Sequence, residues 1–358
     1  MTLSGSFANA TGTLTEVGFR YGTSSASMNN IIKAAVPSYG TDGSFSVNIS
    51  GLAAGQKYYF CAYVVVKGTE SYASQEKTVD AASYGTFTMP EIPQENGDPA
   101  VAKSWLELPG AVSSSNYLVN TYYDGSDTDA NRNYTHCYDK STYTSLWTAY
   151  HLNSTHMGSL TRPGSWSYSP SISEALQVNL KSSSYSSTYS RGHMIPNASR
   201  NGIKNMQLQT FYVTNSVPQI QDDFNGGIWQ NLEAALQSIG KSEEIYIVTG
   251  VAFNKVGENK TVKYTTAKDD TTKQIPVPNY FYKVALRVNK SGGAVSSASA
   301  VGFWFEHKKY TNDSYANYVV TVDQIEQWTG FDFFVNLPDE IEKSAEMNGS
   351  LTSFNNFK

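Results

Sequence analysis

Residues 189–200 read YSRGHMIPNASR, and residues 214–233 read TNSVPQIQDDFNGGIWQNLE. The second stretch leads into an amphipathic pattern, because apolar residues recur every three or four positions from Gly227 to about Ile239. This spacing predicts a helix with one buried face. A histidine-bearing stretch, a polar loop and a helix therefore follow one another, and we expect them to form the centre of the fold.

Two side chains in these stretches suit the hydrolysis of a phosphodiester bond, which needs a base to activate water and a cation to offset the phosphate charge. The pKa of histidine lies near neutrality, so His193 is a candidate general base. Asn225 stands just before the predicted helix, and Mg²⁺ binds few protein ligands and prefers oxygen, so its amide can serve as an anchor. The alternatives are a structural histidine and a plain helix cap.

The rest of the chain from about residue 103 combines the apolar spacing of helices, every three or four residues, with short apolar runs typical of strands. A capping-box pattern predicts a helix from Thr321 that ends at Gly330, and Pro338 favours another helix after it. Runs rich in β-branched and aromatic residues predict strands at 143–152, 208–214, 245–249, 279–288 and 300–305. Strands with a few intervening helices indicate an α+β domain over residues 103–358.

Residues 1–88 have a different character, with short alternating runs at 16–22, 44–50 and 58–66 between turn residues. Period two with frequent turns predicts an all-β antiparallel sandwich. The stretch 51–64, GLAAGQKYYFCAYV, resembles fibronectin type III and immunoglobulin-like modules. Three prolines in residues 89–102 remove backbone donors and predict a linker between two domains. The sequence leaves the partner of the sandwich open.

Composition narrows the classes of partner. The 358 residues carry a formal net charge of −5 and only 16% charged residues, so no global positive field draws in a polyanion. Contacts with nucleic acid must therefore be local. No apolar run is long enough to span a bilayer. Cys61 and Cys137 lie far apart, and we do not expect a bridge between them. The many hydroxyl and amide side chains lead us to expect a secreted, periplasmic or cell-surface protein.

Both opening stretches, in this order, resemble the DNA/RNA non-specific endonucleases, a family of ββα-metal (His-Me finger) nucleases that includes mitochondrial endonuclease G. The resemblance runs over most of residues 105–345, and its late part is VDQIEQWTGFDFFVNLPDEIE at 322–342. The family signature Asp-Arg-Gly-His is matched by SRGH at 190–193. Its downstream pattern is matched by Asn215, Pro218, Gln219, Asn225, Trp229, Leu232 and Glu233.

The resemblance implies a magnesium-dependent enzyme that hydrolyses DNA and RNA through contacts with the phosphate backbone and leaves 5′-phosphate ends. His193 would be the general base and Asn225 the one direct protein ligand of Mg²⁺, with Mn²⁺ or Ca²⁺ as alternative ions. Glu233 would hold the ion through a water molecule. Phosphate contacts and orienting roles would fall to Arg162, Arg191 and Asn215.

Two departures from the family pattern bear on this assignment. Ser190 replaces the usual acidic residue of the signature, and the loop between Asn215 and Asn225 carries one extra residue. A catalytically weakened fold that serves as an extracellular binding or adhesion protein is therefore the main alternative, and a phosphodiesterase for a small substrate is a third. His136, His151, His156 and His307 lack the spacing of a zinc site. Asp222 and Asp223 are expected in a solvated loop rather than at a second cation.

Overall fold

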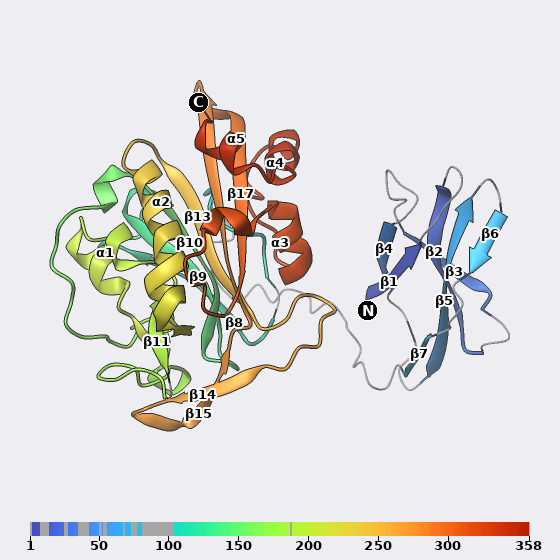
Figure 1. Ribbon diagram of the computed structural model, residues 1–358, viewed down its shortest axis with the longest axis horizontal. Coiled ribbons are helices and arrows are strands. Elements are labelled where there is room, and N and C mark those ends of the chain that lie inside the picture. The colour runs from blue at the N-terminus through green and yellow to red at the C-terminus, as the bar shows by residue number, and fades with distance from the viewer. Residues whose placement is uncertain are drawn as a thin grey trace. The chain divides into compact units, whose positions relative to one another are not determined.

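The computed structural model describes residues 2–7, 14–24, 28–34, 43–49, 52, 56–66, 69–72, 77–80, 104–112, 114–186 and 188–357. The chain divides into two compact units, Met1–Gln94 and Glu95–Lys358. Figure 1 draws both. The linker expected at 89–102 lies outside the described residues. In the described part of the chain, no helix has the length and apolar character needed to cross a bilayer.

The first unit contains only strands among its described residues. A two-stranded sheet pairs β1 with β4, and a second sheet has the order β3-β2-β5-β6 with β7 also paired to β5. Leu3, Val17, Phe19, Phe45 and Phe60 form its buried core. The strands are β1 (Thr2–Phe7), β2 (Leu14–Gly22), β3 (Asn30–Ala34), β4 (Gly43–Asn48), β5 (Lys57–Val66), β6 (Thr69–Tyr72) and β7 (Lys77–Asp80).

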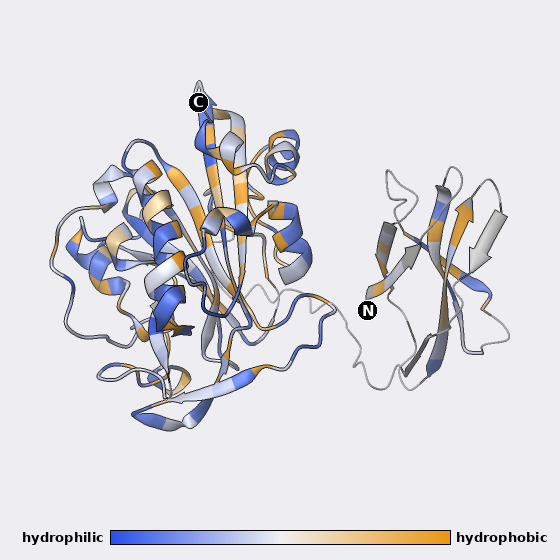
Figure 2. Ribbon diagram, viewed as in Figure 1, coloured by the Kyte–Doolittle hydropathy of each residue, from blue (hydrophilic) through white to orange (hydrophobic). Residues whose placement is uncertain are grey.

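The second unit is built on a seven-stranded antiparallel sheet with the order β18-β17-β16-β13-β10-β9-β8. Its strands are β8 (Tyr117–Tyr123), β9 (Arg132–Asp139), β10 (Thr144–Leu152), β13 (Ile245–Ala252), β16 (Tyr280–Ser291), β17 (Ala294–Glu306) and β18 (Val319–Val320). Every residue of β10 and β13 is buried. Figure 2 shows many hydrophobic residues along the central strands. The sheet therefore lies between two covered faces, which explains its nearly continuous apolar runs.

The helices cover these two faces. On one face, Ile228, Trp229 and Leu232 pack against Ile245 and Ile247 of β13. On the other face, residues of α3 and α4 pack against Tyr246 and Val248, because successive side chains of a strand alternate. The helices are α1 (Lys204–Gln209), α2 (Gln230–Gly240), α3 (Val322–Thr329), α4 (Asp339–Glu346) and α5 (Leu351–Asn355). Figure 1 shows α2 across the sheet, and α3 and α4 to its right.

The local signals at helix ends behave as the sequence predicts. Thr321 caps α3 by accepting a hydrogen bond from the backbone of Gln324, and Gly330 ends this helix with a φ of 75°. Pro338 directly precedes α4. The amphipathic pattern from Gly227 corresponds to α2, preceded by an irregular helical turn over Gln221–Trp229.

The strand predicted at 208–214 is wrong. Residues Lys204–Gln209 form α1, and Val213–Asn215 form a short 3-10 turn. Phe211 and Val213 pack into a small core with Trp166. The apolar residues of this stretch therefore reach the core from turns, which a period-two pattern over seven residues cannot distinguish from a strand.

Candidate active site

A β-hairpin and the helix after it build the site. Strand β11 (Tyr189–His193) pairs antiparallel with β12 (Ser216–Ile220), which places His193 opposite Ser216 and Ser190 opposite Gln219. The chain then passes through the turn Gln221–Trp229 into α2. Although α1 lies between the two strands in the chain, their pairing and the helix after them bring the stretch around residue 193 to the stretch around residue 225.

Five of the six predicted site residues line one cleft of about 560 Å³, namely Arg162, Arg191, His193, Asn225 and Glu233. The sequence motifs therefore meet in space. Asn215 does not line this cleft. The remaining lining residues are mostly uncharged: Trp166, Ser184, Ser190, Pro196, Asn197, Ala198, Gln221, Gly226, Gln230, Ala234 and Gln237.

The imidazole of His193 lies between two aromatic rings. Its centre is 4.6 Å from that of Trp166 and 5.0 Å from that of Phe211. Its Nε2 atom is buried and has no hydrogen-bond partner among the described residues. Burial, followed by the charges of Arg162 and Arg191, lowers the pKa of His193 to about 3. The imidazole is therefore neutral near pH 7 and able to accept a proton.

The two arginines stack on the same aromatic pair. The guanidinium carbon of Arg162 is 5.0 Å from the centre of Phe211, and that of Arg191 is 5.1 Å from the centre of Trp166. Arg191 also donates a 2.7 Å hydrogen bond to the carbonyl of Leu180. Trp166 and Phe211 thus hold the histidine and both cations at one wall of the cleft, where a phosphate needs positive charge.

Asn225 uses its amide nitrogen for contacts within the protein. This nitrogen donates to Gln221 Oε1 at 3.0 Å and to Ser190 Oγ at 3.3 Å. Ser190 in turn donates to the carbonyl of Gln219 at 3.0 Å. Both contacts fix the amide group through its nitrogen, so the amide oxygen is available as a ligand for a hard cation. The serine that departs from the family signature thus supports this amide.

Glu233 lies beside a buried lysine that the sequence analysis missed. Lys283 Nζ is 3.7 Å from Glu233 Oε1, 2.7 Å from Thr249 Oγ1 and 4.4 Å from the centre of the Trp229 ring. Burial raises the pKa of Glu233, and the Lys283 ammonium opposes this shift. The sequence could have indicated this residue, because Lys283 stands within the apolar run of residues 279–288, and a charged residue inside a buried strand needs a partner.

Asn215 is fully buried and holds the backbone that follows His193. Its side chain accepts a hydrogen bond from Ile195 N at 3.0 Å and donates to the carbonyls of Ile195 and Thr210 at 3.0 and 2.8 Å. Its own carbonyl accepts from Met194 N at 3.0 Å. Three of these hydrogen bonds join the residues directly after His193 to the segment before β12, and the bond to Thr210 lies within that segment.

The loop with the extra residue is tied down by a distant segment. Asp223 has a φ of 62°, a left-handed conformation that Asp tolerates better than most residues. Thr311 donates to its carboxylate at 3.1 Å, and Lys309 lies 3.5 Å from the carboxylate of Asp222. The turn before Asn225 absorbs the additional residue in this way.

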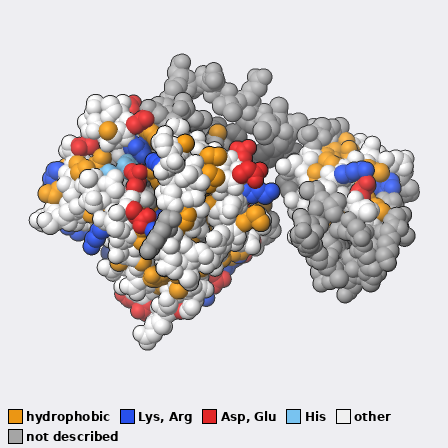
Figure 3. All heavy atoms as spheres, turned by 90° about the horizontal axis from the view of Figure 1, so that it is seen from above, with side chains coloured by type: hydrophobic (Ala, Val, Ile, Leu, Met, Phe, Trp, Pro, Cys, Tyr) orange, Lys and Arg blue, Asp and Glu red, His pale blue; other side chains and the backbone are white. Residues whose placement is uncertain are grey.

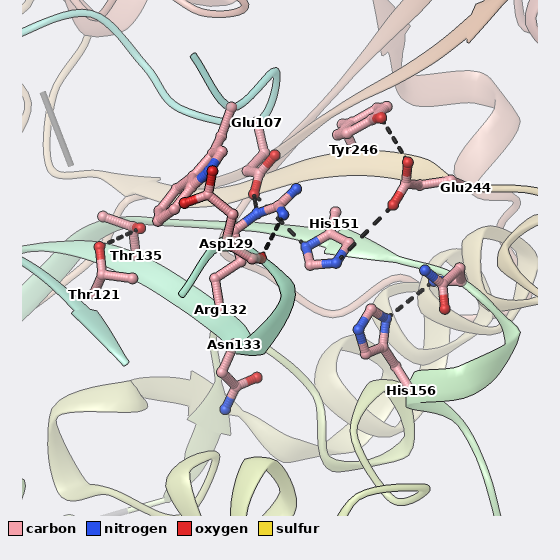
Figure 4. A network of polar contacts seen from close by, with 12 residues as sticks. Glu107, Thr121, Asp129, Arg132, Asn133, Thr135, His151, His156, Glu244 and Tyr246 are labelled. Carbon is pink, nitrogen blue, oxygen red and sulfur yellow. Dashed lines mark hydrogen bonds and ion pairs between the residues drawn. The ribbon is translucent and has the colours of Figure 1, made fainter. Parts of the chain in front are cut away.

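The histidines outside the cleft serve other contacts. His151 lies 3.7 Å from Glu107 and 4.0 Å from Glu244, and Arg132 donates to Glu107 at 2.7 Å (Figure 4). The ring of His151 also contacts that of His156 edge to face. This network ties the segment around Glu107 to strands of the sheet.

The charged side chains on the surface are distributed in a way that fits local rather than long-range attraction of phosphate. Figure 3 shows a face on which most described atoms are neither hydrophobic nor charged side chains, and on which Lys and Arg are scattered. Positive charge for a phosphate is supplied within the cleft by Arg162 and Arg191.

The hairpin, the helix and the polar cleft define the chain as a nuclease with mixed α and β structure. The family model described as DNA/RNA non-specific endonuclease matches residues 113–340, and the chain belongs to this family. The family is metal-dependent, and its members are hydrolases. The predicted function, an endonuclease acting on DNA and RNA, is confirmed, and nothing supports the adhesion alternative.

Three relatives and one solved structure illustrate the similarity. The chain is 28% identical to a nuclease of Nostoc sp. over 66% of its own length and 80% of the relative's. It is also 28% identical to the mitochondrial nuclease 1 of Schizosaccharomyces pombe and to the mitochondrial nuclease EXOG of Danio rerio, over 59% and 55% of its length and 67% and 57% of theirs. The crystal structure of the EndoG/EndoGI complex matches with a TM-score of 0.50 and 21% identity, over 63% of this chain and 89% of that chain.

The expected secreted, periplasmic or cell-surface location is wrong. Several relatives, including those from S. pombe and D. rerio, are named mitochondrial nucleases. The expectation relied on an abundance of hydroxyl and amide side chains. Such a surface keeps a protein soluble in any aqueous compartment, so this composition does not indicate where the protein is located.

Proposed function

We propose that the protein cleaves DNA and RNA by direct attack of water, without a covalent intermediate, with His193 as the general base. The observation that carries this proposal is that His193 lines one cleft with Asn225, Glu233 and two arginines. Burial, followed by the charges of the two arginines, lowers the pKa of His193 and favours the neutral imidazole. It can then take a proton from a water molecule that approaches the phosphorus atom. Low sequence preference follows from a cleft that contacts the backbone of the nucleic acid.

The cation we propose is Mg²⁺. Asn225 would be its direct protein ligand through the amide oxygen, and Glu233 would hold it through a water molecule. The donor set consists of oxygen atoms only, which fits a hard cation that keeps most of its water. When bound, the ion would offset negative charge on the phosphate and the leaving oxygen. Arg162 and Arg191 would bind phosphate oxygens from the aromatic wall of the cleft.

We further propose roles for Asn215 and for the first unit. Asn215 would orient His193 by fixing the backbone at Ile195, and the two hydrogen bonds between its side chain and that backbone are the support. The first unit would be a fibronectin type III or immunoglobulin-like module over residues 1–88, followed by a linker at 89–102 and the nuclease domain at 103–358. Its all-β content and the division near residue 94 support these bounds.

A plasmid assay tests the catalytic proposal. Supercoiled DNA and RNA are incubated with Mg²⁺ or with EDTA, and with the His193→Ala and Asn225→Ala variants. We expect cleavage to need the cation and to fall at least about a hundredfold in H193A, the usual contribution of a general base. Asn231→Ala is the matched control for Asn225, because Asn231 is an exposed residue of α2 outside the cleft. Cleavage by H193A at the wild-type rate would refute the proposal.

A further inference from the structure

A cluster of carboxylates, separate from the cleft, lies on the face of the sheet opposite α2. Asp323 and Glu326 belong to α3, and Glu346 is the last residue of α4. One carboxylate oxygen from each of these three residues lies within 4.8 Å of the other two. Figure 1 shows α3 and α4 beside each other at this face. None of the three residues lines the catalytic cleft.

Glu346 is the least expected member of this cluster. Its side chain is only 6% exposed, and its Oε1 atom is buried without a hydrogen-bond partner among the described residues. A buried, unpartnered carboxylate oxygen is costly. Its position at the C-terminal end of α4 adds to the cost, because the helix dipole is negative there. A donor or a cation beside this oxygen would lower that cost.

The protein supplies little compensation. No described Lys or Arg forms an ion pair with Asp323, Glu326 or Glu346. The backbone N–H of Phe333 donates to Glu326 Oε1 at 2.8 Å. Asp332 and Glu342 add further negative charge nearby. Five acidic residues thus gather on α3, on α4 and in the segment between them, and α4 also carries Lys343, which forms no ion pair with the three cluster residues in the described part of the chain.

Electrostatics support the same conclusion. Burial, followed by repulsion from Glu326, Glu342 and other carboxylates, raises the pKa of Glu346 to about 9. Burial is also the main cause that raises the pKa of Glu326 to about 7. The ionised cluster is therefore unfavourable by itself, and a bound cation would remove both the repulsion and the unsatisfied oxygen.

We propose that Asp323, Glu326 and Glu346 form a second metal site, which binds Ca²⁺. All donors are carboxylate oxygens, the ligands of hard cations, and no sulfur or imidazole is present to favour zinc. Their oxygens lie within 4.8 Å of one another, so small side-chain movements would let all three contact one Ca²⁺, whose coordination geometry is flexible, whereas Mg²⁺ demands a near-ideal octahedron. The ion would join α3 to α4 and stabilise the fold.

Metal stoichiometry and thermal unfolding test this site in the full chain. Bound Ca²⁺ is counted by equilibrium dialysis, and Tm is measured with Ca²⁺ and with EDTA, for the wild type, Glu346→Gln and Glu340→Gln. Glu340 is an exposed residue of the same helix and serves as the matched control. We expect E346Q to bind one Ca²⁺ per chain fewer than the wild type and E340Q, and to lose their Ca²⁺-dependent rise in Tm.

Two results would overturn the proposed Ca²⁺ site. Equal stoichiometry and an equal rise in Tm for E346Q and the wild type would overturn the proposal. So would a wild-type chain whose bound Ca²⁺ is all lost in Asn225→Ala, because the ion would then belong to the catalytic cleft. If E346Q fails to fold, Asp323→Asn replaces it, since Asp323 is only partly buried and its amide keeps the shape of the side chain.

Discussion

The imidazole of His193 owes its low proton affinity to neighbours from three parts of the chain. Trp166 and Phe211 exclude water from the ring, and Arg162 and Arg191 place positive charge near it. A residue with an ordinary histidine pKa would be partly protonated at pH 6.5. Here burial and the two arginines lower the pKa to about 3, so the imidazole of His193 is neutral near pH 7.

We expect the imidazole resonances of His193 not to titrate between pH 8 and pH 4.5. In Arg162→Gln the pKa of His193 should rise, because removing a positive charge favours the imidazolium form, but it should stay below 6.5 because burial is the larger cause. NMR titration of the imidazole groups measures both values, and H193A identifies the resonances. A wild-type pKa near 6.5, or no upward shift in Arg162→Gln, would contradict this account of the site.

Residue chemistry pointed to His193 and Asn225, and the family resemblance added Glu233; the structure places all three at one cleft. Lys283 could not be placed in this way. It reaches Glu233 from β16, a strand far along the chain, and only the packing of α2 on the sheet brings the two together. Ser190 was a visible departure, but its contact with Asn225 needed coordinates.

At the scale of elements, the β11–β12 hairpin depends on a close approach at Gly192. A Cβ atom at this position would lie 2.2 Å from Gln219 Oε1 and 2.6 Å from Gln219 Cβ on the paired strand. These distances are too short for the Gln219 tip alone to move aside. Glycine is thus needed for steric reasons directly before His193.

We expect Gly192→Ala to lower the free energy of unfolding by about 1–3 kcal/mol, the usual cost of overpacking, and to reduce cleavage because His193 is the next residue. Removing the opposing Cβ as well, in G192A/Q219G, should restore most of the loss relative to Q219G alone. Gly164→Ala is the control, since a Cβ there would meet nothing within 4 Å. Denaturant unfolding and the plasmid assay measure the two effects, and a G192A enzyme as stable and active as G164A would argue against the clash.

The elements that were predicted correctly are those with a long, regular pattern. The helix from Gly227 and the strands at 245–249 and 279–288 carry continuous apolar signals, and their boundaries differ from the structure by a few residues. The stretch 208–214 failed because its buried Thr210 and Thr214 form turns and hydrogen bonds with nearby segments. Such tertiary contacts override a short alternating pattern.

At the scale of the whole molecule, the two units make separate contributions. Every residue that lines the catalytic cleft belongs to Glu95–Lys358, and this unit contains its own large buried cores on both faces of the sheet. The net charge of −5 means that the whole chain does not attract nucleic acid over a long range. The first unit is therefore not needed to complete a positive field around the cleft. Catalysis should therefore not depend on residues 1–94.

We expect residues 95–358, expressed alone, to fold and to cleave plasmid DNA with a kcat/KM within about twofold of the full chain, as for a domain with its own core. The full-length H193A variant gives the background rate, and Met1–Gln94 alone should show no cleavage. If the shorter chain folds, with a single cooperative melting transition, but cleaves much more slowly, then the first unit takes part in binding the substrate. A shorter chain that does not fold would instead show that the large unit needs residues 1–94 for its stability, because its buried core alone would then be insufficient.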